Sequence, residues 1–234
     1  MGAIAKLIDH SLLHPMLTDK ELEQGCELAV KFGVACVCIK PCAVPNALEW
    51  LSGSGVALGT VVGFPHGDNR TETKVYEADL ACEDGATELD MVINIGKARG
   101  EDWDFVEREI QSIYDISQKY NALLKVIFEN DFLTEDRLKI KLCEICAQVG
   151  VDFIKTSTGY GFVKRGDGSY SYQGAADRDL KLMREHSPSH IQIKAAGGVR
   201  SLDDVLRVRS LGATRIGASA TEAILAEAKR RGLD

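Results

Sequence analysis

The sequence predicts an α/β fold, a (β/α)8 barrel in which residues 1–234 form one domain. A chain of 234 residues with 45% hydrophobic residues can bury one large core. Seven mostly continuous apolar runs alternate with helix-like segments, as expected for parallel strands buried on both faces. A doubly wound sheet is the alternative, but no G-x-G-x-x-G motif follows the first clear strand. The alternation over this length favours the barrel.

The predicted elements follow one another in a regular order. A short strand is possible at residues 7–12, and Thr18 with Glu21 forms a capping box at the start of the first helix. Thr134 is predicted to cap a helix that runs toward Val149, and Ser201 with Asp204 forms an acidic capping box. The seven clear strands lie in the runs "ACVCI", "ALGTVVGF" (57–64), "ELDMV", "LLKVIFE" (123–129), "FIKTS", "IQIKAAG" (191–197) and "RIGAS".

A weak internal repeat supports this order. Gly33, Gly85, Gly150 and Gly212 each follow a helix-like stretch and precede an apolar run. Such a glycine ends a helix in the left-handed conformation, and a strand follows directly. The repeat is therefore helix–glycine–strand in character, which again indicates alternating strands and helices.

Charge, cysteine content and the N-terminus limit the classes of partner. The formal net charge of −7 is spread along the chain without a long basic run, so nucleic acid is not an expected partner. The opening "MGAIAKLIDHSLLHP" predicts neither a secretory signal nor a membrane span. No membrane partner is expected, and the cytoplasm is the expected location. The seven cysteines are expected to be reduced thiols packed as small hydrophobes.

Charged residues interrupt four of the predicted strands at equivalent positions: Asp90, Lys125, Lys155 and Lys194. Side chains of this kind would be costly to bury without partners, so they should pair with one another or with a ligand. In a barrel, polar residues toward the C-terminal ends of the strands are where catalysis is found. The pattern therefore predicts a shared polar cavity inside the barrel.

Three lysines and one aspartate in one cavity suggest a specific chemistry. Neighbouring cations and burial disfavour the ammonium form of a lysine, and a free amine can attack a carbonyl carbon to form a Schiff base. The iminium then acts as an electron sink, so that a neighbouring C–C bond can break, while Asp90 and a second lysine move protons. This combination predicts an aldolase that needs no metal or other cofactor. For Lys125, a supporting ion-pair role is an equal alternative.

The segments after two of these lysines suggest a phosphorylated polyol substrate. Lys155 leads into "TSTG", whose hydroxyl groups can order a polyol. Gly197 and Gly198 precede a helix capped near Ser201, and the turn "IGAS" (216–219) repeats this layout on the next strand. Backbone amides at such turns bind anions, and barrels often hold a phosphate between their last two strand loops. The alternative is that these glycines serve only tight connections.

Other candidate sites are weaker. The pairs His10 with His14 and His186 with His190 lie in segments interrupted by proline and have no paired carboxylate, so no metal site is predicted. Cys143 and Cys146 are expected to pack inside a helix face. Cys38 lies near the end of the first clear strand, where core packing and a reactive thiol facing the cavity are both possible.

The order of these motifs resembles the deoxyribose-phosphate aldolase family from about Leu7 to Ser219. The similar segments are "LIDHSLLHP", "VCIKP", "TVVGFPHG" with "TETK", "ELDMVINIG", "LLKVIFE", "FIKTSTG", "IKAAGGVR" and "RIGAS". The resemblance implies a class I aldolase on a (β/α)8 barrel. Such an enzyme cleaves 2-deoxy-D-ribose 5-phosphate to acetaldehyde and D-glyceraldehyde 3-phosphate without a metal.

The resemblance also assigns roles to individual residues. It implies that Lys155 forms the Schiff base and that Asp90 and Lys194 transfer protons, with Lys194 also lowering the pKa of Lys155. Substrate-binding positions implied by the resemblance or by the motifs are Asp9, Cys38, Thr158, Gly159, Gly197, Gly198, Gly217, Ala218 and Ser219. The expected partner is a small phosphorylated sugar, and a homo-oligomer is the expected assembly.

Several departures from the family pattern leave the exact sugar phosphate open. The segment "YGFVKRGDGSYSYQGAADRD" is longer and more basic than usual after "TSTG", and as a loop after a barrel strand it should lie over the mouth of the site. Ala220 replaces a serine, Asn130 replaces a threonine, and the C-terminal segment lacks a tyrosine that some members use. Contacts to phosphate from Lys40, Lys164 or Arg165 are possible compensations. The alternatives are an aldolase for another sugar phosphate and a phosphosugar-binding barrel without covalent chemistry.

Overall fold

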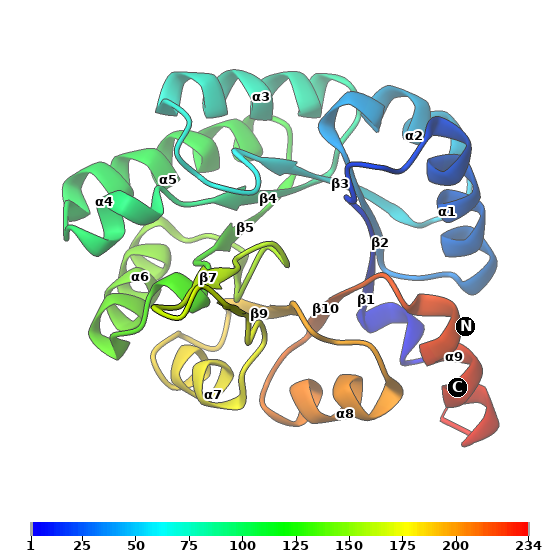
Figure 1. The fold of residues 1–234 in the computed structure, drawn as a ribbon. Helices are drawn as coiled ribbons and strands as arrows, with labels where there is room; N and C mark the ends of the chain where they lie inside the picture. The colour runs from blue at the N-terminus through cyan, green and yellow to red at the C-terminus, as the bar shows by residue number, and fades with distance from the viewer. Residues whose placement is uncertain (1, 234) are drawn as a thin grey trace.

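The seven apolar runs and the short segment at residues 7–12 form eight parallel strands that close into a barrel, as Figure 1 shows for the computed structural model, which describes residues 2–233. The strands follow the order β1-β10-β9-β6-β5-β4-β3-β2 around the barrel. The predicted barrel is confirmed, and the doubly wound alternative is wrong. The strands are β1 (Ile8–Leu12), β2 (Cys36–Ile39), β3 (Ala57–Val62), β4 (Glu88–Val92), β5 (Leu123–Ile127), β6 (Phe153–Lys155), β9 (Gln192–Ala196) and β10 (Arg215–Ala218).

Helices surround the barrel and bury their apolar faces against the outward side chains of the strands. They are α1 (Asp19–Phe32), α2 (Val44–Trp50), α3 (Thr71–Glu83), α4 (Ile95–Arg99), α5 (Trp103–Lys119), α6 (Asp136–Val149), α7 (Asp177–Glu185), α8 (Leu202–Ser210) and α9 (Thr221–Arg230). Three short 3-10 turns also lie outside these strands and helices: η1 (Ala5–Leu7), η2 (Pro41–Ala43) and η3 (Asn130–Phe132). The main core therefore lies in the shell between strands and helices, which leaves the inside of the barrel for other residues.

Most of the predicted helix ends are confirmed. The capping boxes of Thr18 with Glu21 and of Ser201 with Asp204 both form. The expected cap at Thr134 is wrong, because α6 begins at Asp136 and Glu135 takes the N-cap position without a side-chain bond. The four glycines of the repeat all have positive φ angles, and Gly33 and Gly150 are themselves C-caps at 61° and 86°.

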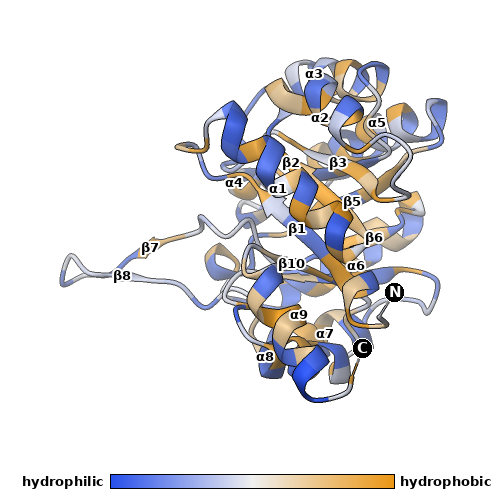
Figure 2. Ribbon diagram, turned by 90° about the vertical axis from the view of Figure 1, so that its right-hand side faces the viewer, coloured by the Kyte–Doolittle hydropathy of each residue, from blue (hydrophilic) through white to orange (hydrophobic). Residues whose placement is uncertain are grey.

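The long segment after β6 contains two strands that the sequence did not predict. Strands β7 (Val163–Lys164) and β8 (Tyr170–Ser171) pair antiparallel as a hairpin. Figure 2 shows this hairpin projecting away from the barrel. The tip of the segment thus points away from the mouth. Only its stem, the part that holds Tyr160, Phe162 and Tyr172, lies beside the strand ends.

Two further properties concern the chain as a whole. Within residues 2–233, no helix has the length and apolar character needed to cross a membrane. All seven cysteines are free thiols, and all except Cys42 are buried, as the sequence predicts. Cys143 and Cys146 pack in the core, which confirms the expected role of this pair.

Candidate active site

The predicted charged residues meet inside the barrel, although their register differs from the expected one. Asp90 pairs with Lys125 across β4 and β5, and Lys155 pairs with Lys194 across β6 and β9. Lys155, however, stands opposite Ile127, two residues beyond Lys125. An offset of two keeps the side chains on the same face of the sheet and moves Lys155 one layer toward the C-terminal rim. The cluster therefore has a deep layer and a layer that approaches the mouth.

Asp90 is the centre of this cluster. Its Oδ1 accepts a hydrogen bond from Lys125 Nζ at 2.8 Å. Its Oδ2 accepts from both Lys155 Nζ and Lys194 Nζ, each at 2.7 Å. All four side chains are buried. One carboxylate thus links three lysines from three different strands, as the sequence pattern predicts.

A second set of carboxylates lies around Lys194 and Lys125. Asp9 on β1 lies 2.5 Å from Lys194 Nζ and 2.5 Å from Arg215 Nη1, and its Oδ2 lies 3.3 Å from Lys125 Nζ. Glu88 lies 2.6 Å from Lys125 Nζ and 2.8 Å from Arg215 Nη2. Lys125 contacts three carboxylates and does not line the pocket described below, so its geometry favours the supporting ion-pair role.

The count of charges in this cluster points to Lys155. Four basic groups face three carboxylates: Lys125, Lys155, Lys194 and Arg215 against Asp9, Glu88 and Asp90. Among residues 2–233, Lys155 has Asp90 as its single carboxylate partner, whereas each of the other three basic groups has at least two. If one of the four basic groups is neutral, the charges of the cluster balance. Deprotonation of Lys155 removes the fewest ion pairs.

The shifts in pKa follow the same pattern. Burial lowers the pKa of Lys155, the contact with Asp90 opposes this change, and the neighbouring Lys194 ammonium adds to it. Burial also acts against the charged form of Lys194, but Asp9 and Asp90 outweigh it and raise the pKa of Lys194. The pKa of Asp90 falls well below its usual value despite burial, because three lysines surround it. The site therefore holds one amine with a lowered pKa beside an amine with a raised pKa and a carboxylate with a lowered pKa.

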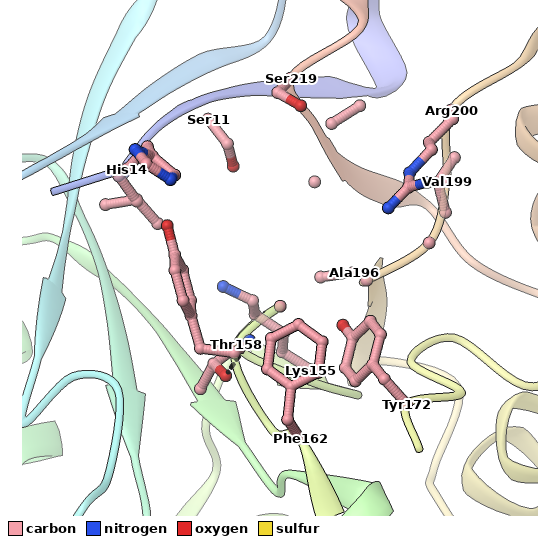
Figure 3. A pocket seen from close by; sticks show the side chains of 17 residues that line it. Ser11, His14, Lys155, Thr158, Phe162, Tyr172, Ala196, Val199, Arg200 and Ser219 are labelled. Carbon is pink, nitrogen blue, oxygen red and sulfur yellow. Dashed lines mark hydrogen bonds between the residues drawn. The ribbon is translucent and has the colours of Figure 1, made fainter. Parts of the chain in front are cut away.

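A pocket of about 270 Å³ opens above Lys155 at the C-terminal ends of the strands. Figure 3 shows the Lys155 amine pointing into it. Asp9, Cys38, Asp90 and Lys194 are buried and do not belong to the lining. The predicted residues that do line the pocket are Lys155, Thr158, Gly159, Gly197, Gly198, Gly217, Ala218 and Ser219.

The glycine turns follow β9 and β10, the two strands next to β6 on one side of the barrel, and form one wall of the pocket. Gly197 and Gly198 have φ angles of 92° and 79°, which side chains with a Cβ rarely adopt. The turn leads to the capped start of α8, and the amides of Gly198 and Val199 donate to no acceptor in the described part of the chain. Free amides at this place are suited to the oxygen atoms of an anion.

Several predicted contacts take a different form. The Thr158 hydroxyl donates to Glu129 and accepts from the Tyr160 amide at 2.9 Å, so it holds the turn after β6 as well as lining the pocket. Burial, with Asp90 as the next cause, raises the pKa of Cys38 to about 11, which keeps it a thiol beside the cluster. Thr158 and Cys38 therefore have fixed places in the wall and floor of the site and are not polar side chains free to move in the pocket.

The suggested compensating cations lie elsewhere. Lys40 donates to the Leu17 carbonyl at 2.7 Å, and Lys164 and Arg165 lie exposed on the hairpin. None of the three lines the pocket. Arg200, which sequence reasoning did not single out, does line it. Its position directly after the glycine pair in "AAGGVR" is a signal that could have identified it.

Other lining residues were also missed by sequence reasoning. Ser11 lies in β1 and His14 follows that strand. Tyr160, Phe162 and Tyr172 come from the stem of the hairpin segment. The expectation that this segment lies over the mouth is therefore met by its stem. No pattern in the sequence distinguishes Tyr172 from the other tyrosines of the segment.

One cluster within residues 2–233 has the proximity that a metal site needs: the ligand atoms of Asp9, Cys36 and Glu88 lie within 4.8 Å of one another. The carboxylates of this cluster already bind Lys125 and Arg215. Burial, followed by Glu88 and Asp9, also raises the pKa of Cys36 well above its usual value. A metal ion would therefore have to displace these two cations, the Lys194 ammonium that also binds Asp9, and a thiol proton.

Comparisons with known proteins agree with this geometry. The family model described as "DeoC/LacD family aldolase" matches residues 3–226. A deoxyribose-phosphate aldolase from Rhodopirellula baltica is 46% identical over 228 residues, which cover 97% of this chain and 90% of that protein. Two solved structures are similar, an aldolase called QR15 and a tetrameric deoxyribose phosphate aldolase from Aeropyrum pernix. Their respective TM-scores are 0.89 and 0.86, with identities of 35% and 30%.

These matches extend over nearly the whole chain. The match with QR15 covers 100% of this chain and 99% of the QR15 chain. The match with the Aeropyrum pernix structure covers 97% of this chain and 91% of that chain. Sequence and fold therefore point to the same class of enzyme as the lysine cluster does. This chain belongs to the DeoC/LacD family of aldolases.

Proposed function

We propose that this chain is a class I aldolase that cleaves 2-deoxy-D-ribose 5-phosphate to acetaldehyde and D-glyceraldehyde 3-phosphate, reversibly and through a Schiff base on Lys155. The observation that carries the proposal is the placement of Lys155. Its amine has a lowered pKa, contacts a single carboxylate and faces the pocket. The names of the relatives, which are deoxyribose-phosphate aldolases, support the choice of substrate.

The chemistry follows from the properties of this amine. The neutral Lys155 attacks the C1 aldehyde carbon of the open-chain sugar, and water leaves to give an iminium ion. The C2–C3 bond then breaks: its electron pair moves toward the iminium nitrogen to form an enamine, and the C3 hydroxyl loses its proton to become the aldehyde of D-glyceraldehyde 3-phosphate. Protonation of the enamine at C2 and hydrolysis release acetaldehyde and restore the amine.

Asp90 and Lys194 supply the proton transfers in this proposal. Lys194 stays protonated beside Asp9 and Asp90, so it can donate a proton while its charge disfavours the ammonium form of Lys155. Asp90 lies 2.7 Å from both amines and can pass protons between them. Asp9 fixes Lys194, and Cys38 forms part of the wall behind the cluster.

The phosphate group is proposed to bind at the glycine turns across the pocket. The amides after Gly197, the turn at Gly217 and Ala218, and the Ser219 hydroxyl surround this place. Arg200 adds a positive charge at the same wall. Thr158 and Gly159 would contact the sugar chain between Lys155 and the phosphate.

Trapping the imine tests the proposal. Sodium borohydride in the presence of deoxyribose 5-phosphate should leave a reduced adduct on Lys155, detected by mass spectrometry of peptides, and inactivate the enzyme. The Lys155→Met variant should give no adduct and no measurable cleavage, because the nucleophile is missing. Phosphate binding by this variant serves as its control for folding. A folded wild-type protein that binds the substrate without forming the adduct would make it a phosphosugar-binding barrel instead.

A second candidate is a Schiff-base aldolase for another sugar phosphate. The hairpin stem, which places Tyr160, Phe162 and Tyr172 at the mouth, motivates this alternative. A panel of aldose phosphates measured by kcat/KM separates the two candidates. A clear preference for a sugar other than deoxyribose 5-phosphate would favour the second.

We also propose that residues 1–234 act as one catalytic domain in the cytoplasm, although residues 1 and 234 lie outside the described part. The reaction would fit deoxyribonucleotide catabolism and carbohydrate degradation. A homo-oligomer is the proposed assembly, because the Aeropyrum pernix relative is described as a tetramer and Leu48, Tyr76 and Leu80 are exposed on α2 and α3. Light scattering of the purified protein would measure the assembly.

A further inference from the structure

The hydroxyl group of Tyr172 is a buried polar group for which the mechanism above has no use. It lies in the wall of the active-site pocket and has no hydrogen-bond partner among residues 2–233. Folded proteins rarely leave a buried hydroxyl without a partner, because the group has given up its bonds to water. A group that binds in the pocket would supply the missing acceptor.

The position of this hydroxyl is specific. It lies so close to Gly197 that a Cβ atom on that residue would collide with it. A Cβ on Gly159 would lie 4.0 Å from the same oxygen. Figure 3 shows the hydroxyl pointing into the space that Arg200 and Ser219 also border. The oxygen therefore lies beside the turn whose next two amides, those of Gly198 and Val199, have no acceptor within residues 2–233.

The tyrosine is held in this place by its neighbours. The Asp131 carboxylate accepts hydrogen bonds from the amides of Gln173, at 2.6 Å, and Gly174, at 2.9 Å. The Ala175 amide donates to the Gly197 carbonyl at 3.0 Å, which ties the returning strand of the segment to the glycine turn. The ring of Phe162 packs at 5.3 Å between centroids. These contacts fix the tyrosine beside the glycine turn before any ligand binds.

We propose that Tyr172 is a specificity-determining residue whose hydroxyl donates a hydrogen bond to the phosphate group of the substrate at the Gly197–Gly198 turn. The identity of the substrate rests on the proposed function, whereas the anion-binding role does not. Burial, with Glu129 and Asp131 as further causes, raises the pKa of Tyr172, so the hydroxyl stays protonated as a donor. A donor aimed at an anion forms one of the stronger hydrogen bonds in proteins.

The Tyr172→Phe variant tests this role, because it removes only the oxygen. Calorimetry with inorganic phosphate should show binding about 10- to 100-fold weaker than in the wild type, as expected for a hydrogen bond to a charged group. The kcat/KM for deoxyribose 5-phosphate should fall by a similar factor. Cleavage of unphosphorylated 2-deoxyribose should stay within about twofold of the wild type, because that substrate lacks the acceptor.

Tyr170→Phe is the matched control. Tyr170 lies on β8 of the same hairpin, is 63% exposed and does not line the pocket, so neither measurement should change. Unchanged phosphate binding in Tyr172→Phe would overturn the proposal. An equal loss on both sugars would also overturn it and assign Tyr172 a structural role.

Failure of the proposed function would look different. In that case the wild type would cleave neither sugar and form no adduct on Lys155. The phosphate titration would still compare Tyr172→Phe with the wild type and decide the role of the hydroxyl.

Discussion

Lys155 differs from the other basic residues of the barrel interior in its surroundings more than in its chemistry. Its amine contacts one carboxylate, while Lys194 contacts two and Lys125 contacts three. A buried ammonium is stabilised in proportion to the acceptors around it, so the amine with one partner loses its proton first. The pocket lies above that same amine. The single carboxylate partner and the place at the pocket thus distinguish Lys155 as the proposed nucleophile.

Replacing Lys194 with leucine should shift the pH dependence of imine formation to higher pH. The substitution removes an ammonium that lowers the pKa of Lys155 and leaves Asp9 and Asp90 with one cation fewer. Both changes favour the protonated form of Lys155, so its pKa rises and less free amine is present at neutral pH. The rate at pH 7 should fall about 100-fold or more, since the proposed proton donor is also lost.

Borohydride trapping at a series of pH values measures this shift. Lys181→Leu on the exposed face of α7 is the control and should leave the profile unchanged. A Lys194→Leu enzyme with the wild-type rate and profile would show that Lys194 does not control the amine.

Sequence reasoning identified the central residues because burial makes a charge on an apolar strand conspicuous. Asp90, Lys155 and Lys194 stand out in this way, and the structure brings them within hydrogen-bond distance. The offset of Lys155 by two residues could not be seen, because the stagger of a closed barrel belongs to pairs of strands. Tyr172 could not be found either, since no local sequence pattern shows that the conformation of the hairpin stem places it in the pocket wall.

At the scale of elements, the first strand and the last helix are joined by a buried histidine. His10 on β1 forms a hydrogen bond of 2.8 Å between its Nδ1 and the hydroxyl of Thr221, the first residue of α9. Burial lowers the pKa of His10 to about 4. The folded protein therefore holds this side chain neutral at pH values where the unfolded chain would protonate it.

This difference predicts a loss of stability in acid. Because the folded pKa is depressed, the contribution of His10 is complete above the ordinary pKa of 6.5 and is lost as the pH falls toward about 4. The free energy of unfolding should decrease by up to about 3 kcal/mol over this range from this group. The variant His10→Asn has no imidazole to protonate at this position. Its free energy of unfolding should therefore rise relative to that of the wild type as the pH falls.

Urea unfolding of both proteins between pH 7 and pH 4.5 checks this expectation. His190→Asn, at an exposed position, is the control and should follow the wild type at every pH. Parallel curves for the wild type and His10→Asn would contradict a depressed pKa for His10.

Most elements could be predicted from local signals, and the exceptions have physical causes. Apolar runs and glycine C-caps mark the strands well, because each signal lies within a few residues. The hairpin of β7 and β8 was missed, since two-residue strands outside the barrel carry no apolar run. Thr134 suggested a helix start one residue too early, because an adjacent Glu135 takes the N-cap without a side-chain bond.

At the scale of the whole molecule, the charged cluster links strands on different sides of the barrel. Lys125 on β5 reaches Asp9 on β1, Glu88 on β4 and Asp90 on β4. Its ammonium is fully buried, and the three carboxylates raise its pKa despite that burial. The interior of the barrel is therefore held by ionic contacts as well as by the surrounding apolar shell.

Replacing Lys125 with methionine should destabilise the whole barrel. The change leaves three carboxylates with fewer cations in a buried place, which typically costs about 3–5 kcal/mol. It should also raise the pKa of Lys155, because Asp90 loses a competing partner. Lys119→Met is a matched control, as Lys119 forms an exposed pair with Asp79, and it should destabilise the protein much less than Lys125→Met does. Chemical unfolding measures both values, and equal stability of the two variants would refute the structural role of Lys125.

The anchoring of the hairpin stem has a consequence for how this barrel can be altered. Glu129 holds Thr158 before the hairpin, and Asp131 holds Gln173 and Gly174 after it, so both anchors come from the few residues that follow β5. The hairpin and these anchors form a module contributed by two separate stretches of the chain. Grafting residues 160–174 onto a relative would transfer substrate preference only if residues 129–131 travelled with them. Enzyme engineering on this scaffold should therefore exchange both stretches together, and the tip of the hairpin can be shortened independently.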